Sequence, residues 1–170
     1  DPANKAVHFF VDDYQFNRLW TNPDAYLDML RRFKAVCTPD FSTYTDFPKA
    51  VQIWNHYRKH WLGAYWQGNG ITVIPTISWS DESSFEWCFD GEPVGGAVAV
   101  SSVGTQLNKC AAELFRLGYD EMLRRLNPST IYFYGLVPEE CKSDKVISLM
   151  TFQDSLKKRI GSRKNSGGVL

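Results

Sequence analysis

The stretch GAVAVSSVGTQLNKCAAELFRLGYDEMLRRLNPSTIYFY, residues 96–134, decides the fold class of this chain. Its two ends, residues 96–100 and 130–134, are apolar runs of strand length. Residues 111–126 between them repeat apolar side chains at helical spacing among charged ones. A strand, a helix and a second strand in this order predict two parallel strands joined by a helical crossover.

The same alternation continues outward from this stretch in both directions. Further strands are predicted at residues 7–11, 35–37, 71–77 and 146–150, and further helices at residues 23–33, 47–67 and 84–89. We therefore predict an α/β fold, with a mainly parallel sheet of about five or six strands and covering helices. Six strands are too few for the eight of a complete barrel, so an open or incompletely closed sheet is favoured and an incomplete, barrel-like fragment is the second arrangement.

Length and composition predict one globular domain. The 170 residues suit a single α/β domain over residues 1–160, followed by a flexible basic tail over residues 161–170. A hydrophobic content of 44% against 22% charged residues excludes general disorder. Because no apolar run approaches the ~18 residues of a membrane span, a membrane partner is not expected.

Charge and cysteine content narrow the function classes. The 19 basic and 19 acidic side chains cancel, which excludes the bulk positive field that carries non-specific DNA binding. The four cysteines match neither a metal knuckle nor a dense disulfide framework, so a reduced cytoplasmic setting is expected. The sequence opens at Asp1 and not at a methionine, which leaves room for an upstream segment.

Carboxylates, hydroxyls and aromatic rings follow the predicted strands, at the edge where parallel α/β folds usually bind ligands. The candidates for catalysis are Asp12, Asp13 and Asp40, and the candidates for substrate binding are Arg58, Trp79, Ser80, Ser101 and Ser102. Asp13 and Asp40 could also hold Mg²⁺. Helix capping is favoured over a role in chemistry for Asp46, and for Asp81 or Ser84. Capping explains the three catalytic candidates less well, because no helical sequence starts directly after them.

Arg58 occupies an unusual position in the helix predicted at residues 47–67. It falls in the middle of the predicted apolar face, which comprises Phe47, Ala50, Val51, Trp54, Tyr57, Trp61, Leu62 and Tyr65. A buried guanidinium needs an anionic partner, so we expect a hydrogen bond to Asp13 or Asp40, or contact with an anionic ligand. Extension of the side chain past the aromatic rings to solvent is the alternative.

Two further features of the sequence allow more than one interpretation. His56 and His60 have the i, i+4 spacing of zinc ligands, but Tyr57 and not Glu follows the first, and both lie opposite the predicted apolar face. A solvated face is therefore favoured over a metal site. Trp79 could stack on a base or sugar ring, or pack in the core.

These stretches resemble a family of uncharacterised phage and mobile-element proteins that is known as a domain of unknown function. The resemblance covers roughly residues 8–135. It rests on the segments HFFVDDY (residues 8–14), PDFS (39–42) and VIPT (73–76), and on residues after each of them, such as Arg58, Trp79 and Ser80. It implies a phage or mobile-element origin, hence the cytoplasm of a host cell, and no mechanism.

The candidate residues leave two classes of function open. The first is an enzyme that acts on a nucleotide or nucleic acid, with the strand-end aspartates as general base or Mg²⁺ ligands; the same residues suit a glycoside-type hydrolase with paired carboxylates. The second is a counter-defence protein without turnover, which sequesters a nucleotide or blocks a host protein. Carboxylate geometry and ligand binding distinguish these hypotheses.

Overall fold

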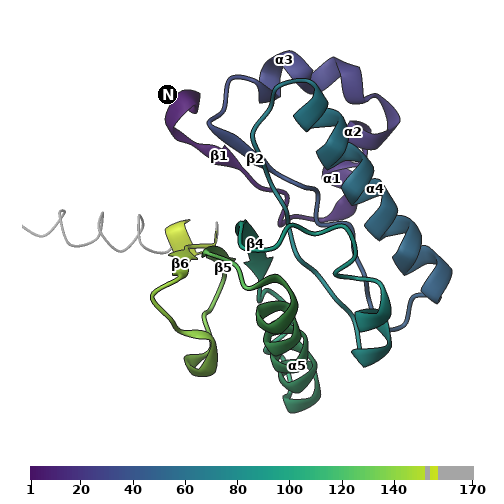
Figure 1. Ribbon diagram of the computed structural model, residues 1–170, viewed down its shortest axis with the longest axis vertical. Helices are drawn as coiled ribbons and strands as arrows, with labels where there is room; N and C mark the ends of the chain where they lie inside the picture. The colour runs from purple at the N-terminus through teal and green to yellow at the C-terminus, as the bar shows by residue number, and fades with distance from the viewer. Residues whose placement is uncertain (152–153, 157–170) are drawn as a thin grey trace, which may run out of the picture.

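Six parallel strands follow one another in chain order in the computed structural model, which describes residues 1–151 and 154–156 (Figure 1). One sheet contains β1 (Ala6–Val7), β2 (Ala35–Cys37) and β3 (Val73–Ile74), and the other contains β4 (Ala97–Ser101), β5 (Thr130–Tyr134) and β6 (Val146–Leu149). A parallel bridge between Thr76 and Ala99 joins β3 to β4 across the two sheets. The predicted α/β fold with a mainly parallel sheet is confirmed. The predicted tail, residues 161–170, lies outside the described residues.

Helical segments connect successive strands. The α-helices are α1 (Asp13–Phe16), α2 (Arg18–Thr21), α3 (Leu27–Leu30), α4 (Lys49–Gly68) and α5 (Lys109–Leu126). The 3₁₀ turns are η1 (Pro2–Asn4), η2 (Pro23–Tyr26), η3 (Glu82–Glu86) and η4 (Glu139–Cys141). Helix α5 begins after Asn108, whose side-chain oxygen accepts a hydrogen bond from the Ala111 N–H, and ends at Asn127 in the left-handed region.

Two strands and one helix of the first half are shorter than predicted, whereas β2 has the predicted bounds. Of the strand predicted at residues 7–11, only Val7 pairs with β2. Of the strand predicted at residues 71–77, only β3 and the bridge at Thr76 pair with a neighbouring strand. The helix predicted at residues 23–33 is η2 followed by one turn of α3. An apolar pattern indicates burial, whereas the pairing itself depends on where the neighbouring strand lies.

The two sheets curl toward each other, which matches the incomplete barrel. In a flat sheet, β1 and β5 would lie about 19 Å apart, four strand spacings of about 4.8 Å. The ring of Tyr134, at the end of β5, nevertheless lies 5.1 Å from the ring of Phe10 and 4.7 Å from the ring of His8, both just after β1. The hollow side of the sheet therefore brings the ends of these distant strands together.

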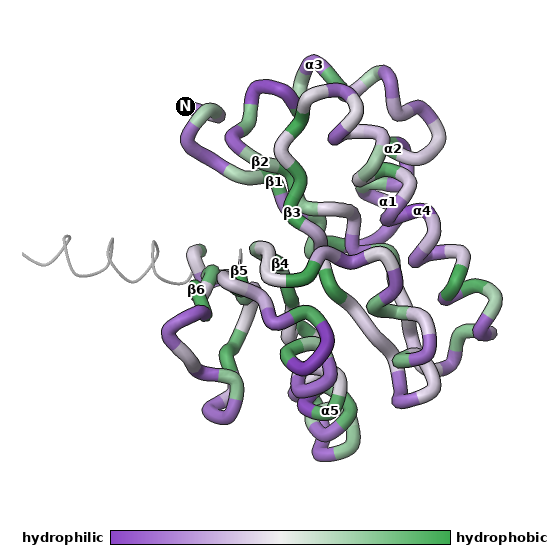
Figure 2. The backbone as a smooth tube through the Cα atoms, in the orientation of Figure 1, coloured by the Kyte–Doolittle hydropathy of each residue, from purple (hydrophilic) through white to green (hydrophobic). Residues whose placement is uncertain are grey.

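The interior divides into two apolar clusters. The first lies between β1–β3 and the helices up to α4 and includes Leu30, Val36 and Trp66; the second lies between β4–β6 and α5 and includes Met122 and Phe133. In Figure 2 the inner strands carry mainly apolar residues, and α5 alternates between polar and apolar ones. The buried residues of α5 follow the predicted spacing.

Helix α4 packs through a different face from the predicted one. The predicted apolar face leaves Val51, Trp54, Tyr57 and Trp61 exposed, whereas Gln52, Asn55, Lys59, Leu62, Gly63 and Trp66 are buried. The prediction of the buried face was thus wrong over the first three turns. The physical reason is that the buried polar groups have partners in distant segments, while the exposed aromatic rings pack on one another and on Trp20.

Candidate active site at the carboxyl ends of the strands

A cavity of about 920 Å³ opens at the carboxyl ends of β1 to β4. Residues that follow each of these strands line it: Asp12, Asp40, Ser42, Asp46, Trp79, Ser80 and Ser101 are among them. Thr43, Thr45, Thr105 and Asn108 add further polar groups. Among the described residues that line this cavity there are acidic, hydroxyl, amide and aromatic side chains, and none is a lysine or an arginine.

Asp40 has the most perturbed carboxyl group in the cavity. Burial raises its pKa to about 7; the positive charge of Lys59 opposes this rise and the negative charge of Asp13 adds to it. No hydrogen bond of the Asp40 carboxyl is found within the described part of the chain. A carboxyl group that titrates near neutral pH can both donate and accept a proton, as general acid–base chemistry requires.

Asp13 faces the segment after β2, where Ser42 holds its carboxylate. The two oxygens accept hydrogen bonds from the Ser42 N–H at 3.2 Å and from the Ser42 hydroxyl at 2.8 Å. Neither Asp13 nor Asp40 belongs to a group of three close metal-ligating side chains in the described residues. A Mg²⁺ ion at these two carboxylates therefore stays a prediction.

Arg58 does not bind either predicted carboxylate. Its guanidinium donates to the side-chain oxygens of Asn55, at 2.5 Å, and Asn17, at 3.1 Å, and lies over the ring of Phe41 at 3.9 Å. The expected hydrogen bond to Asp13 or Asp40 was wrong, because these amides and the aromatic face take its place. Burial lowers the pKa of Arg58, and the nearby charge of Asp13 counteracts this.

Arg58 and Asp13 are nevertheless joined through two residues. The Asn55 side chain that accepts from Arg58 donates to the Ser42 carbonyl at 2.5 Å, and Ser42 in turn holds Asp13. This chain of hydrogen bonds makes Arg58 a support of the cavity wall. It does not place Arg58 among the residues that line the cavity.

Trp79 packs in the core, as one of its two predicted roles requires, and it also lines the cavity. Its indole N–H donates to the Leu114 carbonyl at 3.2 Å, and its ring lies 5.3 Å from that of Phe115. At Gly118 an added Cβ would lie only 2.2 Å from the indole. The ring is therefore a fixed wall of the cavity.

The three predicted serines have different surroundings. Ser80 is buried at the cavity, and its hydroxyl has no partner within the described residues. Ser101 also lines the cavity, and its hydroxyl accepts from the Val103 N–H. Ser102 is not among the lining residues, because its hydroxyl donates to the Leu136 carbonyl at 2.6 Å in the loop after β5.

The remaining aspartates test the capping argument. Helix α1 begins directly after Asp12, so the prediction that no helix starts there was wrong; the Asp12 carboxylate nevertheless makes no cap bond and lines the cavity. Asp46 does not cap α4, which begins after Pro48. Asp81 caps η3 as predicted, since its carboxylate accepts from the Ser83 N–H at 2.9 Å.

A second polar cluster, which the sequence analysis did not identify as a site, lies on α4. The buried Lys59 ammonium contacts Glu92 at 2.6 Å and donates to the Thr76 carbonyl at 2.9 Å. His56 and His60 lie beside Glu92. The i, i+4 spacing of the two histidines was the only sign of this cluster in the sequence. Because the wrong face of α4 was predicted to be buried, both histidines were expected to be solvated. Glu92 lies more than 30 positions away along the chain.

Comparison with known proteins gives the chain a family. The family model described as "Domain of unknown function (DUF4417)" matches residues 2–153, a wider span than residues 8–135. The "Gene 1 protein" of Mycobacterium phage L5 is 48% identical over 130 residues, 76% of this chain and 57% of that protein. The "Gene 1 protein" of Mycobacterium phage D29 is 40% identical over 157 residues, 91% of this chain and 58% of that protein.

The chain thus spans a little over half the length of these two relatives. No solved structure matches it. Within the described residues, no helix has the length and apolar character needed to cross a membrane.

Proposed function

This chain belongs to the DUF4417 family, which includes mycobacteriophage proteins, and from this premise we propose that the domain is an enzyme acting on a neutral, hydroxyl-rich ring such as a nucleoside or another glycoside. Asp40 is the general acid–base. The observation that carries the proposal is the position of Asp40, without a hydrogen-bond partner in the described chain, in a cavity whose lining carries no basic side chain.

The lining favours a neutral ligand over a phosphate. Phosphate groups are usually bound by Arg, Lys or a metal ion, because the dianion must be neutralised. Carboxylates, hydroxyls and a fixed indole suit the hydroxyl groups and flat faces of sugars and bases instead. The rigid Trp79 supplies such a face in the cavity that Asp40 also lines.

The proposed reaction is hydrolysis of a glycosidic bond. Protonated Asp40 donates its proton to the leaving group while the bond from the sugar carbon to that group breaks, and a water molecule forms the new bond to the carbon. Asp12 lines the same cavity and makes no cap bond, so its carboxylate is the group that accepts the proton of the attacking water.

A second candidate is Mg²⁺-dependent chemistry on a nucleotide. Three aspartates, Asp12, Asp40 and Asp46, line the cavity, and carboxylate oxygens are the ligands that Mg²⁺ prefers. The ion would then neutralise the phosphate in place of a basic side chain.

The four cysteines are free thiols, which supports action in the reducing cytoplasm of a host cell.

The test is a substrate screen of the purified domain against nucleosides, nitrophenyl glycosides and nucleotides, each with EDTA and with Mg²⁺. We expect turnover of a neutral glycoside in EDTA and a loss of at least 100-fold in Asp40→Asn. Asp144→Asn, at an exposed carboxylate outside the lining residues, is the matched control and should keep full activity.

Other outcomes separate the alternatives. Turnover of nucleotides only with Mg²⁺ would favour the second candidate. Ligand binding that Asp40→Asn abolishes, without turnover of any compound, would instead identify a binding protein of the counter-defence type. Full activity in Asp40→Asn would remove Asp40 from the mechanism.

A further inference from the structure

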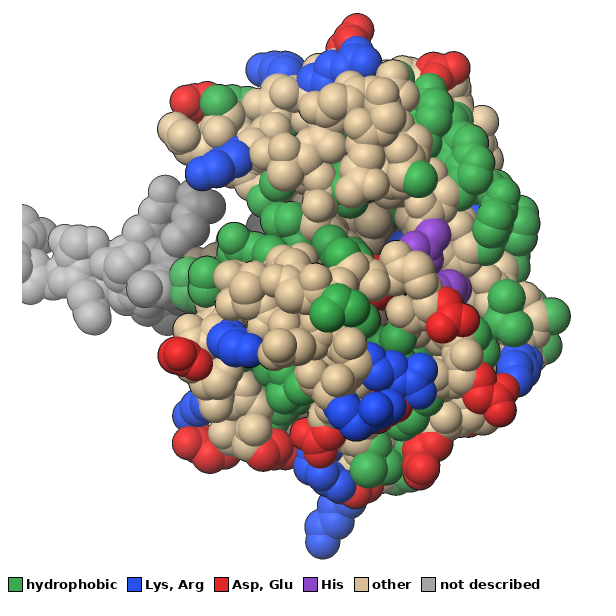
Figure 3. Space-filling view, viewed as in Figure 1, with side chains coloured by type: hydrophobic (Ala, Val, Ile, Leu, Met, Phe, Trp, Pro, Cys, Tyr) green, Lys and Arg blue, Asp and Glu red, His purple; other side chains and the backbone are tan. Residues whose placement is uncertain are grey.

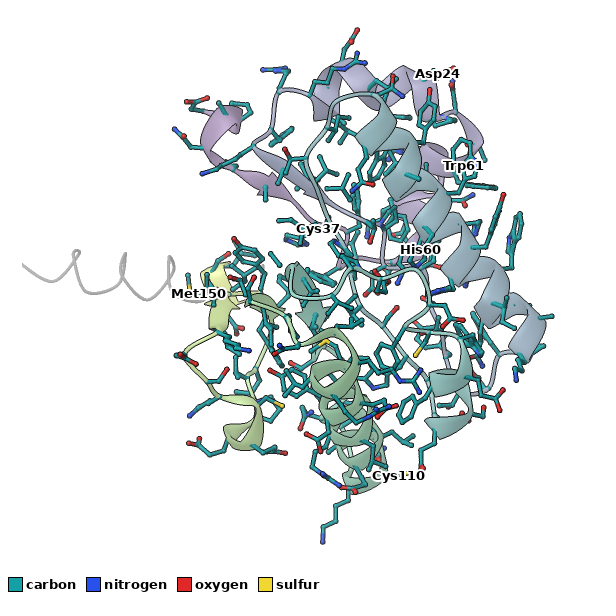
Figure 4. The ribbon with its side chains drawn as sticks, in the orientation of Figure 1. Asp24, Cys37, His60, Trp61, Cys110 and Met150 are labelled. Atoms are coloured by element: carbon teal, nitrogen blue, oxygen red, sulfur yellow. The ribbon has the colours of Figure 1, made fainter. Side chains whose placement is uncertain are left out.

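Three metal-ligating side chains meet on α4, away from the cavity. His56 and His60 lie one turn apart on this helix, and Glu92 reaches them from the loop between η3 and β4. One ligand atom from each residue lies within 4.8 Å of the other two. Figure 3 shows histidine side chains at the surface beside α4, and Figure 4 labels His60 there. None of the three residues lines the cavity.

The contacts of His56 leave one of its ring nitrogens available to a metal ion. Its Nε2 lies 3.2 Å from the Asp90 carbonyl oxygen, which can only accept a hydrogen bond, so Nε2 carries the proton and Nδ1 carries the lone pair. Metal-binding histidines commonly donate their second N–H to a backbone carbonyl in this way.

The contact between His60 and Glu92 has a separation that also suits two ligands of one ion. His60 Nε2 is buried and lies 3.1 Å from Glu92 Oε1. Two ligands of a tetrahedral ion with bonds of about 2.0–2.1 Å lie about 3.3 Å apart. The observed separation fits one edge of that tetrahedron.

We propose that His56, His60 and Glu92 bind a divalent transition-metal ion, with Zn²⁺ the best match. Two imidazoles and a carboxylate are a donor set that Zn²⁺ accepts readily, whereas Mg²⁺ and Ca²⁺ prefer oxygen ligands alone. Three protein ligands leave the fourth position of the ion open.

Two neighbours of the cluster hold Glu92 in place. Gly91 adopts φ +75°, a conformation that glycine tolerates best, and a Cβ there would lie 3.4 Å from the His60 ring. Lys59 contacts the same Glu92 oxygen that faces His60. Its positive charge orients the carboxylate and also repels a cation, so this site binds Zn²⁺ less tightly than one without the lysine.

The experiment is calorimetric titration of EDTA-stripped, desalted protein with ZnCl₂, accompanied by the absorption spectrum of the Co²⁺-loaded protein. We expect one ion per chain and the visible absorption of tetrahedral Co²⁺. His56→Gln and His60→Gln should each weaken binding at least tenfold and remove that absorption. Because the third histidine of the chain, His8, packs on Phe10 and Tyr134, His8→Gln is the matched control and should bind like the parent.

Circular dichroism of each variant checks that it is folded. Glu92→Gln is less suitable, since it leaves the buried Lys59 without its partner. Absence of saturable binding to the parent chain would overturn the proposal, as would equal binding by the parent and both α4 histidine variants. Neither result bears on Asp40, because the substrate screen in EDTA is independent of this site.

Discussion

The two long helices, α4 and α5, bury opposite kinds of side chain. Helix α5 buries Phe115, Tyr119 and Met122 and leaves its charged residues in solvent. Helix α4 buries Lys59 and Asn55, with the Lys59 side chain only 3% exposed, while Trp54 on its outer side is 48% exposed. Trp61, labelled in Figure 4, belongs to the same outer side.

The difference matches the roles that we propose for the two helices. Burying a polar or charged group costs free energy unless every one of its hydrogen bonds is satisfied, so a helix that serves packing alone has no reason to do it. Local rules of stability are most often broken at functional sites. Helix α4 supports the cavity through Asn55 and carries two of the proposed metal ligands, whereas α5 supplies the surface on which Trp79 rests.

The largest expected effect is on the buried ion pair of α4. Lys59→Met leaves the carboxylate of Glu92, itself 1% exposed, without its cation and should lower the free energy of unfolding by about 3–5 kcal/mol. Lys59→Met combined with Glu92→Leu should recover most of this loss, because both charges are then gone. Urea denaturation measures both.

The corresponding control on α5 is Arg116→Met. Arg116 forms ion pairs with Glu113 and Asp120 on the surface, which solvent screens, so its loss should leave the melting temperature almost unchanged. A comparable loss in Arg116→Met and Lys59→Met would contradict the contrast between the two helices.

The next effect concerns the close contact of α5 with Trp79. In Gly118→Ala the new methyl group would overlap the indole, so the ring must move, at a cost of about 3 kcal/mol. Gly68→Ala, at the end of α4, is the control because an added Cβ there meets nothing within 4 Å. That control should keep or slightly raise the melting temperature. Tryptophan fluorescence during thermal unfolding follows both, and an unchanged Gly118→Ala would show that Trp79 is not fixed.

A smaller, pH-dependent effect is expected at Asp40. Its pKa is raised to about 7 in the folded state from a usual value of 3.8, so the folded state binds the proton more tightly than the unfolded chain does. Between about pH 4 and pH 7 the free energy of unfolding therefore falls as the pH rises. Asp40→Asn removes the buried charge and should be more stable than the parent at pH 8 by a few kcal/mol.

Asp40→Asn and the parent should be closest in stability near pH 3, where the Asp40 carboxyl is largely protonated in both the folded and the unfolded state. Melting temperatures from pH 3 to pH 8 measure the difference. A constant difference over this range would mean that the Asp40 carboxyl titrates normally.

The smallest effect is expected on the outer side of α4. Trp54→Ser removes a half-exposed ring that stacks on Tyr57 and meets Trp20 edge to face, so it should cost about 1 kcal/mol or less. Tyr119→Ser, at a buried ring of α5, is the matched control and should cost about 3 kcal/mol. Similar losses in the two variants would show that the aromatic rings of α4 belong to the core.

The sequence predicted the second half of the fold more accurately than the first. The strand predicted at residues 130–134 is β5 without change, and the helix predicted at residues 111–126 lies within α5. Around β1 and β3 the pattern marked buried segments, but pairing is limited to two residues in each strand. Side-chain periodicity indicates which residues are buried, whereas strand pairing depends on the position of the neighbouring strands.

The candidate site, like the fold, was predicted only in part. Strand-end logic identified Asp12, Asp40, Trp79, Ser80 and Ser101, and the structure places all five at one cavity. The positions of residues after the strands did not indicate that the Ser102 hydroxyl donates to the Leu136 carbonyl. They also did not indicate that Arg58 donates to Asn17 and Asn55 and not to the predicted carboxylates. Such choices depend on side chains that only the folded chain brings together.

The sequence by itself determined the order of strands and helices and hence the edge at which polar residues gather, because both follow from local spacing along the chain. Only the tertiary structure decided which face of α4 is buried. Lys59 lies 33 positions from Glu92, and a helical wheel contains no information about partners at that distance. A charged face becomes an interior one when a distant segment supplies the opposite charge, so the His56, His60 and Glu92 cluster could be recognised only after the chain was folded.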